Sequence, residues 1–197
     1  LVAALTWARG DMAYARRYWD LLRQWANYLL AKGLNPENQL CTDDFAGHLA
    51  YNVNLSLKAL LGVAAYARLC IQNGMTEEGE QIRAQTEAMA QQWLQMADDG
   101  DHYRLAFDKP GTWSQKYNLV WDKLLGLHLF PPEVARKEIT FYKEQQGPYG
   151  LPLDNRSAYT KLDWIVWSAC LSEDEGDFAT FIEPLYRWLN ETESRVP

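Results

Sequence analysis

Three residues of this chain have side chains that could carry out a hydrolytic reaction, and each stands near the start of a predicted buried helix: Asp44, Lys116 and Asp163. The two carboxylates could form an acid–base pair, one of them with a raised pKa, or one of them could act as a base on water. Lys116 could stabilise a developing oxyanion. The alternative is that both carboxylates are solvated or salt-bridged to Lys116 or Lys161. We therefore take Asp44, Asp163 and Lys116 as the candidate catalytic residues.

A further set of polar and aromatic residues in the same segments could bind a substrate. Aromatic rings among them could stack on a ligand, and polar groups could fix its orientation. A lone histidine such as His48 is, however, more often a hydrogen-bonded interior residue than a base or a ligand. The candidate binding residues are Asp43, His48, Asn52, Asp108, Trp113, Gln115, Tyr117, Asp154, Tyr159 and Lys161.

Each of the three long loops carries the motif Leu-x-x-Asp before a predicted buried helix, beginning at Leu40, Leu105 and Leu151. Nine positions after each aspartate comes a polar residue at the start of a predicted helix, namely Asn52, Tyr117 and Asp163. This recurrence predicts a repeated helical hairpin. Because an aspartate before a helix most often caps it or forms a turn, a structural role is favoured for Asp43, Asp108 and Asp154.

Apolar periodicity predicts about seven main helices, which are alternately amphipathic and apolar on most faces. The amphipathic helices are residues 3–32, 76–97, 133–146 and 176–190, and the more buried ones are residues 46–72, 115–129 and 161–171. The run Trp164–Leu171 could by itself be a buried strand, but its context favours a helix. Short connections favour antiparallel neighbours. We therefore predict an all-α fold of antiparallel helical hairpins in two layers, either an α/α toroid of the six-hairpin type or a partial arc of one.

The long polar loops of this arrangement all lead into the buried helices, so they should meet at one end of the domain. The first turns of those helices point free N–H groups and positive dipole ends there, which suits a carboxylate or an oxyanion. We expect a concave ligand pocket with apolar walls at this end.

Composition and motifs exclude several classes of protein. The 197 residues fit one domain, spanning 1–197, and the net charge of -7 argues against a nucleic-acid partner. No run approaches the ~18 apolar residues of a membrane span, so we predict no membrane partner. His102 and His128 lack partners at metal-ligand spacing, and no phosphate-binding loop is present, so we predict neither a metal nor a cofactor.

Long motifs at the three loops resemble the glutaminase A family. They are Gln39–Ala50 (QLCTDDFAGHLA), Ala106–Asn118 (AFDKPGTWSQKYN), and Tyr149–Asp154 with Tyr159–Trp164 (YGLPLD and YTKLDW). The closing segment Leu189–Pro197 is similar too, so the resemblance covers nearly the whole chain. It implies a six-hairpin helical domain similar to that of α/α-toroid glycosidases, within a larger secreted or periplasmic protein.

The activity implied by this resemblance is hydrolysis of L-glutamine to L-glutamate and ammonia. The resemblance also implies that the chain packs against an N-terminal region of the same protein, which this piece lacks. Two alternatives stay open. One is a six-hairpin glycoside hydrolase, in which two carboxylates act on a sugar. The other is a non-catalytic module that binds a sugar or packs against the rest of the protein. The flanks of a partial ring would expose apolar helix faces, so we also expect the isolated piece to self-associate.

Overall fold

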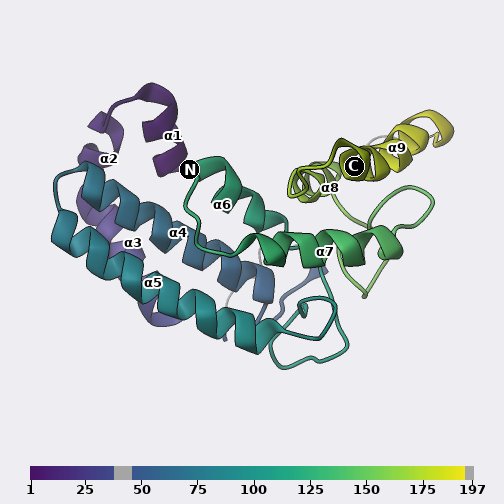
Figure 1. The fold of residues 1–197 in the computed structure, drawn as a ribbon, viewed down its shortest axis with the longest axis horizontal. Helices are drawn as coiled ribbons and strands as arrows, with labels where there is room; N and C mark the ends of the chain where they lie inside the picture. Colours follow the sequence, from purple (N-terminus) through teal and green to yellow (C-terminus); the bar gives the residue numbers. More distant parts are fainter. Residues whose placement is uncertain (38–45, 194–197) are drawn as a thin grey trace.

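The computed structural model describes residues 1–37 and 46–193, and this part of the chain is built from helices joined by loops (Figure 1). The predicted all-helical fold is confirmed. The elements are α1 (Val2–Arg9), α2 (Ala13–Arg17), α3 (Trp19–Lys32), α4 (Val53–Gln72), α5 (Thr76–Ala97), the 3-10 helix η2 (Tyr117–Leu119), α6 (Val120–Leu125), α7 (Pro132–Gln145), α8 (Leu162–Ala169) and α9 (Glu175–Glu191).

The centre of the fold is α4, which buries side chains on most of its faces. It buries 12 residues, as its nearly continuous apolar sequence requires. After the turn at Asn73 and Gly74 the chain reverses, and α5 runs antiparallel along α4 (Figure 1). The indole Nε1 of Trp93 on α5 donates to the carbonyl of Val53 at 3.1 Å, which fixes the far end of this hairpin.

The remaining helices extend the same two-layer plan. On α5 the buried residues recur every three or four positions, which leaves its other face to solvent; they are Gly79, Ile82, Thr86, Ala90, Trp93 and Ala97. The inner elements α4, η2, α6 and α8 lie side by side in chain order. Helix α4 contacts η2 and α6, and η2 contacts α8. The segment beginning at Trp164 is the helix α8, as predicted, and it packs against α9.

Three predicted helix boundaries were wrong, each because of local backbone conformation. The predicted helix 3–32 is interrupted at Gly10, which has a φ of 70°, and again at Tyr18. The predicted helix 46–72 begins only at Val53, since Gly47 and Tyr51 have φ values of 88° and 61°. The predicted helix 115–129 shrinks to η2 and α6, because the left-handed Gly126 ends it.

Length and composition alone would also suit α4 to a membrane span, but the buried core helix of a folded domain meets the same criteria. Most of that segment is covered by other parts of the chain. Its hydrophobicity is therefore accounted for by packing.

Candidate functional site

The three long loops that precede α4, η2 and α8 meet one another, as the sequence predicted. We call the described parts of these loops together with the first residues of the elements they lead into, residues 46–54, 98–117 and 146–164, the loop cluster. The amide of Val53 donates to the carbonyl of Leu105 at 3.0 Å, and the amide of Gln115 donates to the carbonyl of Leu153 at 2.8 Å. Short antiparallel bridges pair Asn52 with Ala106 and Ser114 with Asp154. Loops from three successive hairpins are thus joined by backbone hydrogen bonds.

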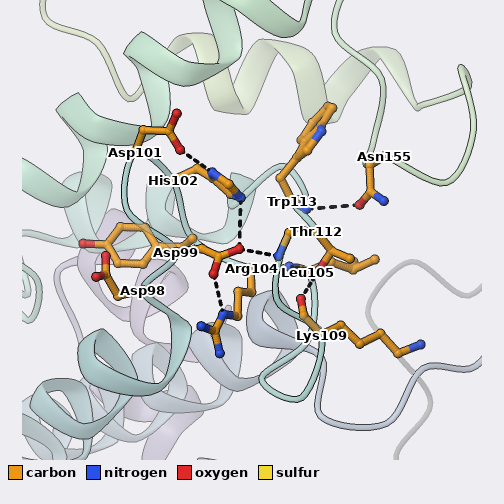
Figure 2. A network of polar contacts seen from close by, with 12 residues as sticks. Asp98, Asp99, Asp101, His102, Arg104, Leu105, Lys109, Thr112, Trp113 and Asn155 are labelled. Atoms are coloured by element: carbon orange, nitrogen blue, oxygen red, sulfur yellow. Dashed lines mark hydrogen bonds and ion pairs between the residues drawn. The ribbon is translucent and has the colours of Figure 1, made fainter.

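The middle loop is held in shape by Asp99, whose carboxylate several donors surround (Figure 2). It accepts from the amide of Gly111 at 2.6 Å and from Nε of Arg104 at 3.0 Å. His102 lies between two carboxylates, with Nδ1 2.6 Å from Asp101 and Nε2 3.6 Å from Asp99. Burial acts to raise the pKa of Asp99, but the hydrogen bonds from Gly111 and Arg104 outweigh it and lower that pKa.

Asp154 holds the third loop to its neighbours rather than capping α8. Its carboxylate is buried and pairs with the guanidinium of Arg156, with Nη2 to Oδ2 at 2.6 Å. A second guanidinium nitrogen of Arg156 donates to the carbonyl of Ala46 in the first loop at 3.1 Å. The neighbouring Asn155 accepts from the amide of Trp113 at 3.1 Å (Figure 2). Of the other repeated aspartates, Asp108 is exposed, and Asp43 lies outside the described residues.

Buried amide side chains occupy the start of α4. Asn52 is its N-cap and accepts from the amide of Leu55 at 2.7 Å. Asn54 accepts from Nδ2 of Asn118 at 3.2 Å, which ties α4 to η2. Both Asn52 and Asn54 are buried, and within the described part of the chain their Nδ2 groups have no hydrogen-bond partner. These two amide donors give the loop cluster unused hydrogen-bonding capacity.

Gln115 connects the second and third loops through its buried side-chain amide. Its Nε2 lies 3.1 Å from the carbonyl oxygen of Leu151 and 2.9 Å from that of Pro152. Its Oε1 accepts from the hydroxyl of Ser168 on α8 at 3.0 Å. The side chain is fully buried, so these contacts position α8.

Lys116 lies in the protein interior, in contact with α7. Its ammonium group donates to the carbonyls of Tyr103 and Ser114, both at 2.8 Å, and lies 3.6 Å from a carboxylate oxygen of Glu138. The hydroxyl of Tyr142 donates to the same carboxylate, and burial raises the pKa of Tyr142. The Lys116 and Glu138 side chains are both fully buried. These contacts suit Lys116 to positioning the loop.

Aromatic residues at the starts of η2 and α8 stack on each other. The rings of Tyr117 and Trp164 are nearly parallel, with centroids 4.5 Å apart and an interplanar angle of 5°, and both side chains are buried. The ammonium group of Lys161 lies 4.8 Å from the Trp164 ring centroid. Asp163, in the first turn of α8, is exposed, as is Tyr159. Asp163 is therefore open to solvent at a helix N-terminus.

The loop cluster thus brings together most of the predicted site residues, in two environments. Gln115, Lys116, Tyr117 and Asn52 are buried and hold the elements together, and Trp113 is largely buried beside them. His48, Asp108, Tyr159, Lys161 and Asp163 are exposed. Asp44 lies outside the described residues.

Sequence reasoning missed Glu138 and Asn54. Glu138 follows the apolar Val134 by four positions and precedes Tyr142 by four, so helical spacing places it on the buried face of α7. An acidic residue at such a position was an available signal of a buried ion pair. Asn54 stands in the same way among apolar residues of α4.

A cavity of about 600 Å³ lies away from the loop cluster, where short turns join the helices. Its lining comes from α6, from α7 and from the turn that follows α8. Its wall includes Phe130, Ile139 and Leu171, with Asp122 among the polar residues. Burial raises the pKa of Asp122, although the amides of Leu129 and Phe130 hydrogen-bond to it. The pocket expected at the long-loop end stays a prediction.

Within residues 1–37 and 46–193, no group of three or more His, Cys, Asp or Glu side chains is arranged to hold a metal ion. Cys70 and Cys170 are free thiols, and Cys41 lies outside those ranges.

Comparison with known proteins places these features in a family. Residues 1–197 match the family model described as the glutaminase A six helical-hairpin domain. The chain is 35% identical over 199 residues to glutaminase A of Aspergillus oryzae, an alignment that covers 98% of this chain and 29% of that protein. It is 30% identical over 213 residues to a protein of Arthroderma benhamiae named "Probable glutaminase", covering 93% of this chain and 25% of the relative. The chain therefore spans between a quarter and a third of the length of these two relatives.

Proposed function

The chain belongs to the glutaminase A family, and we propose that it is the part of a glutamine-hydrolysing enzyme in which the loop cluster faces the substrate. The observation that carries this proposal is the joining of three loops at the starts of α4, η2 and α8. Such an arrangement places exposed polar side chains from distant parts of the sequence beside a rigid framework, which is what an amidohydrolase site needs.

The reaction divides the loop-cluster residues into two groups. Asp163 is exposed and acts as the base: it takes a proton from water as the water oxygen attacks the side-chain amide carbon of glutamine, and the proton passes to the departing ammonia. The amides of Trp164 and Ile165 donate to the carbonyl of Lys161, so the amides of Leu162 and Asp163, at the start of a helix with no side-chain cap, support the developing oxyanion. Asp44 remains a proposed alternative base.

The buried residues act by positioning in this proposal. Gln115 orients α8 through Ser168, and Lys116 fixes the loop ahead of η2 through its contacts with Ser114 and Glu138. Because the Lys116 ammonium group is enclosed, it acts on the substrate through the loop that it holds.

No observation of the described residues supports the alternative of a glycoside hydrolase as the joined loops support the amidohydrolase. The aromatic pair Tyr117 and Trp164 is buried, with each ring covering the other, so this pair does not offer an open face to a sugar. Of the repeated carboxylates, Asp154 is engaged by Arg156. We therefore do not propose sugar hydrolysis.

The proposal is tested by measuring ammonia release from L-glutamine with the full-length protein that contains this chain and with its Asp163→Asn variant. A lost general base lowers the rate by about 100-fold or more, while the folded state is preserved because Asp163 is exposed. Glu144→Gln, an exposed change on α7, is the matched control and leaves the rate unchanged. Circular dichroism verifies that each variant is folded. A folded full-length wild-type protein that releases no ammonia, or an Asp163→Asn variant that keeps the full rate, contradicts the proposal.

A further inference from the structure

The cavity of about 600 Å³ near Phe130 lies between two successive helical hairpins. Its lining residues all fall between Leu119 and Asp177. They belong to η2 and α6, to α7 with the turn before it, and to the segment that leads from α8 into α9. Both hairpins that enclose the cavity are therefore present in the chain. A cavity of this size accommodates a small organic molecule.

Hydrogen bonds between the hairpins fix the walls of this cavity. The ammonium group of Lys123 on α6 donates to the carbonyls of Cys170 and Ser172 at 3.0 and 3.1 Å. The hydroxyl of Ser172 donates to the carboxylate of Asp177 at 3.0 Å, and the ammonium group of Lys143 on α7 lies 2.6 Å from the same carboxylate. The three walls are thus joined to one another, as in a preformed ligand pocket.

The deep side of the cavity is apolar. Its side chains come from both hairpins and are almost fully buried: Leu119, Phe130, Val134, Ile139 and Leu171. A molecule that fills this space must therefore present an apolar group to them.

Negative charge predominates among the polar side chains of the cavity. Four acidic and two basic side chains line it: Asp122, Glu173, Asp174, Asp177, Lys123 and Arg136. Both basic groups have partners, because Lys123 binds two carbonyls and Arg136 pairs with Glu133. Among the residues that the structure describes, Asp177 forms an ion pair with Lys143, whereas the other three acidic residues of the lining form none. The charge of the cavity therefore favours a cation.

Asp122 is the partly buried carboxylate of this group. Its two oxygens each accept from one backbone amide, that of Leu129 or Phe130, both at 3.0 Å. A carboxylate oxygen can accept two hydrogen bonds, so each oxygen keeps capacity for another donor. Burial raises the pKa of Asp122, and the two amides, together with His128 when it is protonated, oppose this effect. A cationic ligand beside Asp122 would offset the same cost of burial.

We propose that this cavity binds a small organic cation, with its ammonium group on the carboxylate of Asp122 and its apolar group against Phe130 and Ile139. The exposed Glu173 and Asp174 at the rim disfavour an anion of the same size. The site is separate from the loop cluster, because α8 leads from one to the other and its eight residues span about 12 Å.

Isothermal titration of the full-length protein that contains this chain tests the proposal with two probes of similar shape and opposite charge. The 2-phenylethylammonium cation binds, and the 3-phenylpropionate anion binds at least about tenfold more weakly. A protein that binds neither probe, or binds both equally well, overturns the proposal.

Variants of the cavity locate the binding site of the cation. Asp122→Asn lowers its affinity about tenfold or more, because a neutral amide replaces the carboxylate. Ala135→Leu fills the cavity from α7 and abolishes binding, while it leaves both amide hydrogen bonds of Asp122 in place. Glu144→Gln, an exposed change on α7 outside the lining, is the matched control and leaves the affinity unchanged.

Circular dichroism verifies that each variant is folded. An affinity that Ala135→Leu leaves unchanged overturns the proposal, even if Asp122→Asn does not fold. Asp163→Asn, in the loop cluster, also leaves the affinity for the cation unchanged. Loss of binding in that variant overturns the proposal, because it would place the probe at the loop cluster.

Discussion

The ion pair of Lys116 and Glu138 lies in the interior, with both side chains fully buried. Removing two charges from water costs several kcal/mol per ion, and only good geometry offsets this cost. Here Glu138 accepts from the amide of Tyr103 at 2.8 Å and from the hydroxyl of Tyr142, while two carbonyls surround the ammonium group. The pair therefore fixes the position of the second loop on α7. Loss of either partner would leave the other charge buried and unpaired, which would lower the stability of the fold.

We expect Lys116→Met to destabilise the fold by about 3 to 5 kcal/mol, because it leaves the Glu138 carboxylate buried without its cation. The free energy of unfolding in denaturant measures this loss. Adding Glu138→Gln removes the stranded charge, so the double variant should lose less than the sum of the two single variants, by about 1 to 3 kcal/mol. Strict additivity would show that the two side chains do not interact.

The pKa of Asp99 gives a pH-dependent prediction for the second loop. Its pKa is lowered in the folded state, so its contribution to stability is fully present above the unfolded value of about 3.9 and is lost as the pH falls through the folded value. Asp99→Asn should cost about 1 kcal/mol at neutral pH.

That difference should shrink as the pH falls below about 3.9, as measured by thermal or denaturant unfolding of both proteins. A difference that grows on acidification would contradict the assignment. Glu144→Gln, which changes an exposed acid on α7, controls for the general effect of removing a carboxylate.

Residue type and position were enough to predict which loop residues gather together, but they were not enough to predict the role of each. Lys116 was selected because it precedes a buried helix. Its enclosure depends on Glu138 and Tyr142, which belong to another hairpin, and a local pattern cannot describe that contact. Asp163 is exposed, so its position at the start of α8 does not depend on contacts with another hairpin. The sequence prediction that it stands at a helix start therefore agrees with the structure.

At the scale of helices, the close approach of α4 and α5 depends on Gly79. A Cβ atom there would lie 2.6 Å from Cγ1 of Ile71 and 2.8 Å from the carbonyl oxygen of Ala67. We expect Gly79→Ala to push the two helices apart and to cost about 1 to 3 kcal/mol of unfolding free energy.

Gly62 on α4 is the matched control, because its Cβ would meet only Cδ1 of Leu29 at an ordinary 3.5 Å. Gly62→Ala should leave stability unchanged or raise it by up to about 1 kcal/mol, since alanine favours a helix more than glycine does. Equal effects of the two substitutions would show that packing at Gly79 is not the cause.

Helix existence could be predicted from the sequence more completely than helix limits. The apolar pattern of Thr76–Ala97 has no interruption and is bounded as predicted. Before α4, apolar residues continue in front of the helix, and the positive φ of Tyr51 together with the Asn52 cap decides where it begins. Apolar periodicity indicates which side chains face the core, and it therefore predicts that a helix exists. It does not indicate the backbone conformation of single residues, which decides where the helix begins.

At the scale of the whole molecule, the two-layer plan follows from the alternation of amphipathic and buried helices. That alternation also places the long loops at one end, so the contacts of Leu105 with Val53 and of Gln115 with Leu153 could be anticipated. The cavity near Phe130 could not, because its lining residues come from separate elements, α6, α7 and the turn after α8, whose spacing a local pattern does not describe.

Stability should fall from the centre of the molecule toward its N-terminal end. Helix α1 buries only Thr6 and α2 only Ala15, whereas α4 buries 12 residues. Local opening of α1 and α2 therefore exposes little apolar surface, while opening of α4 requires global unfolding. In hydrogen exchange followed by mass spectrometry, amides of α1 and α2 should exchange orders of magnitude faster than those of α4. Equal protection of α1 and α4 would show that the N-terminal helices unfold together with the core.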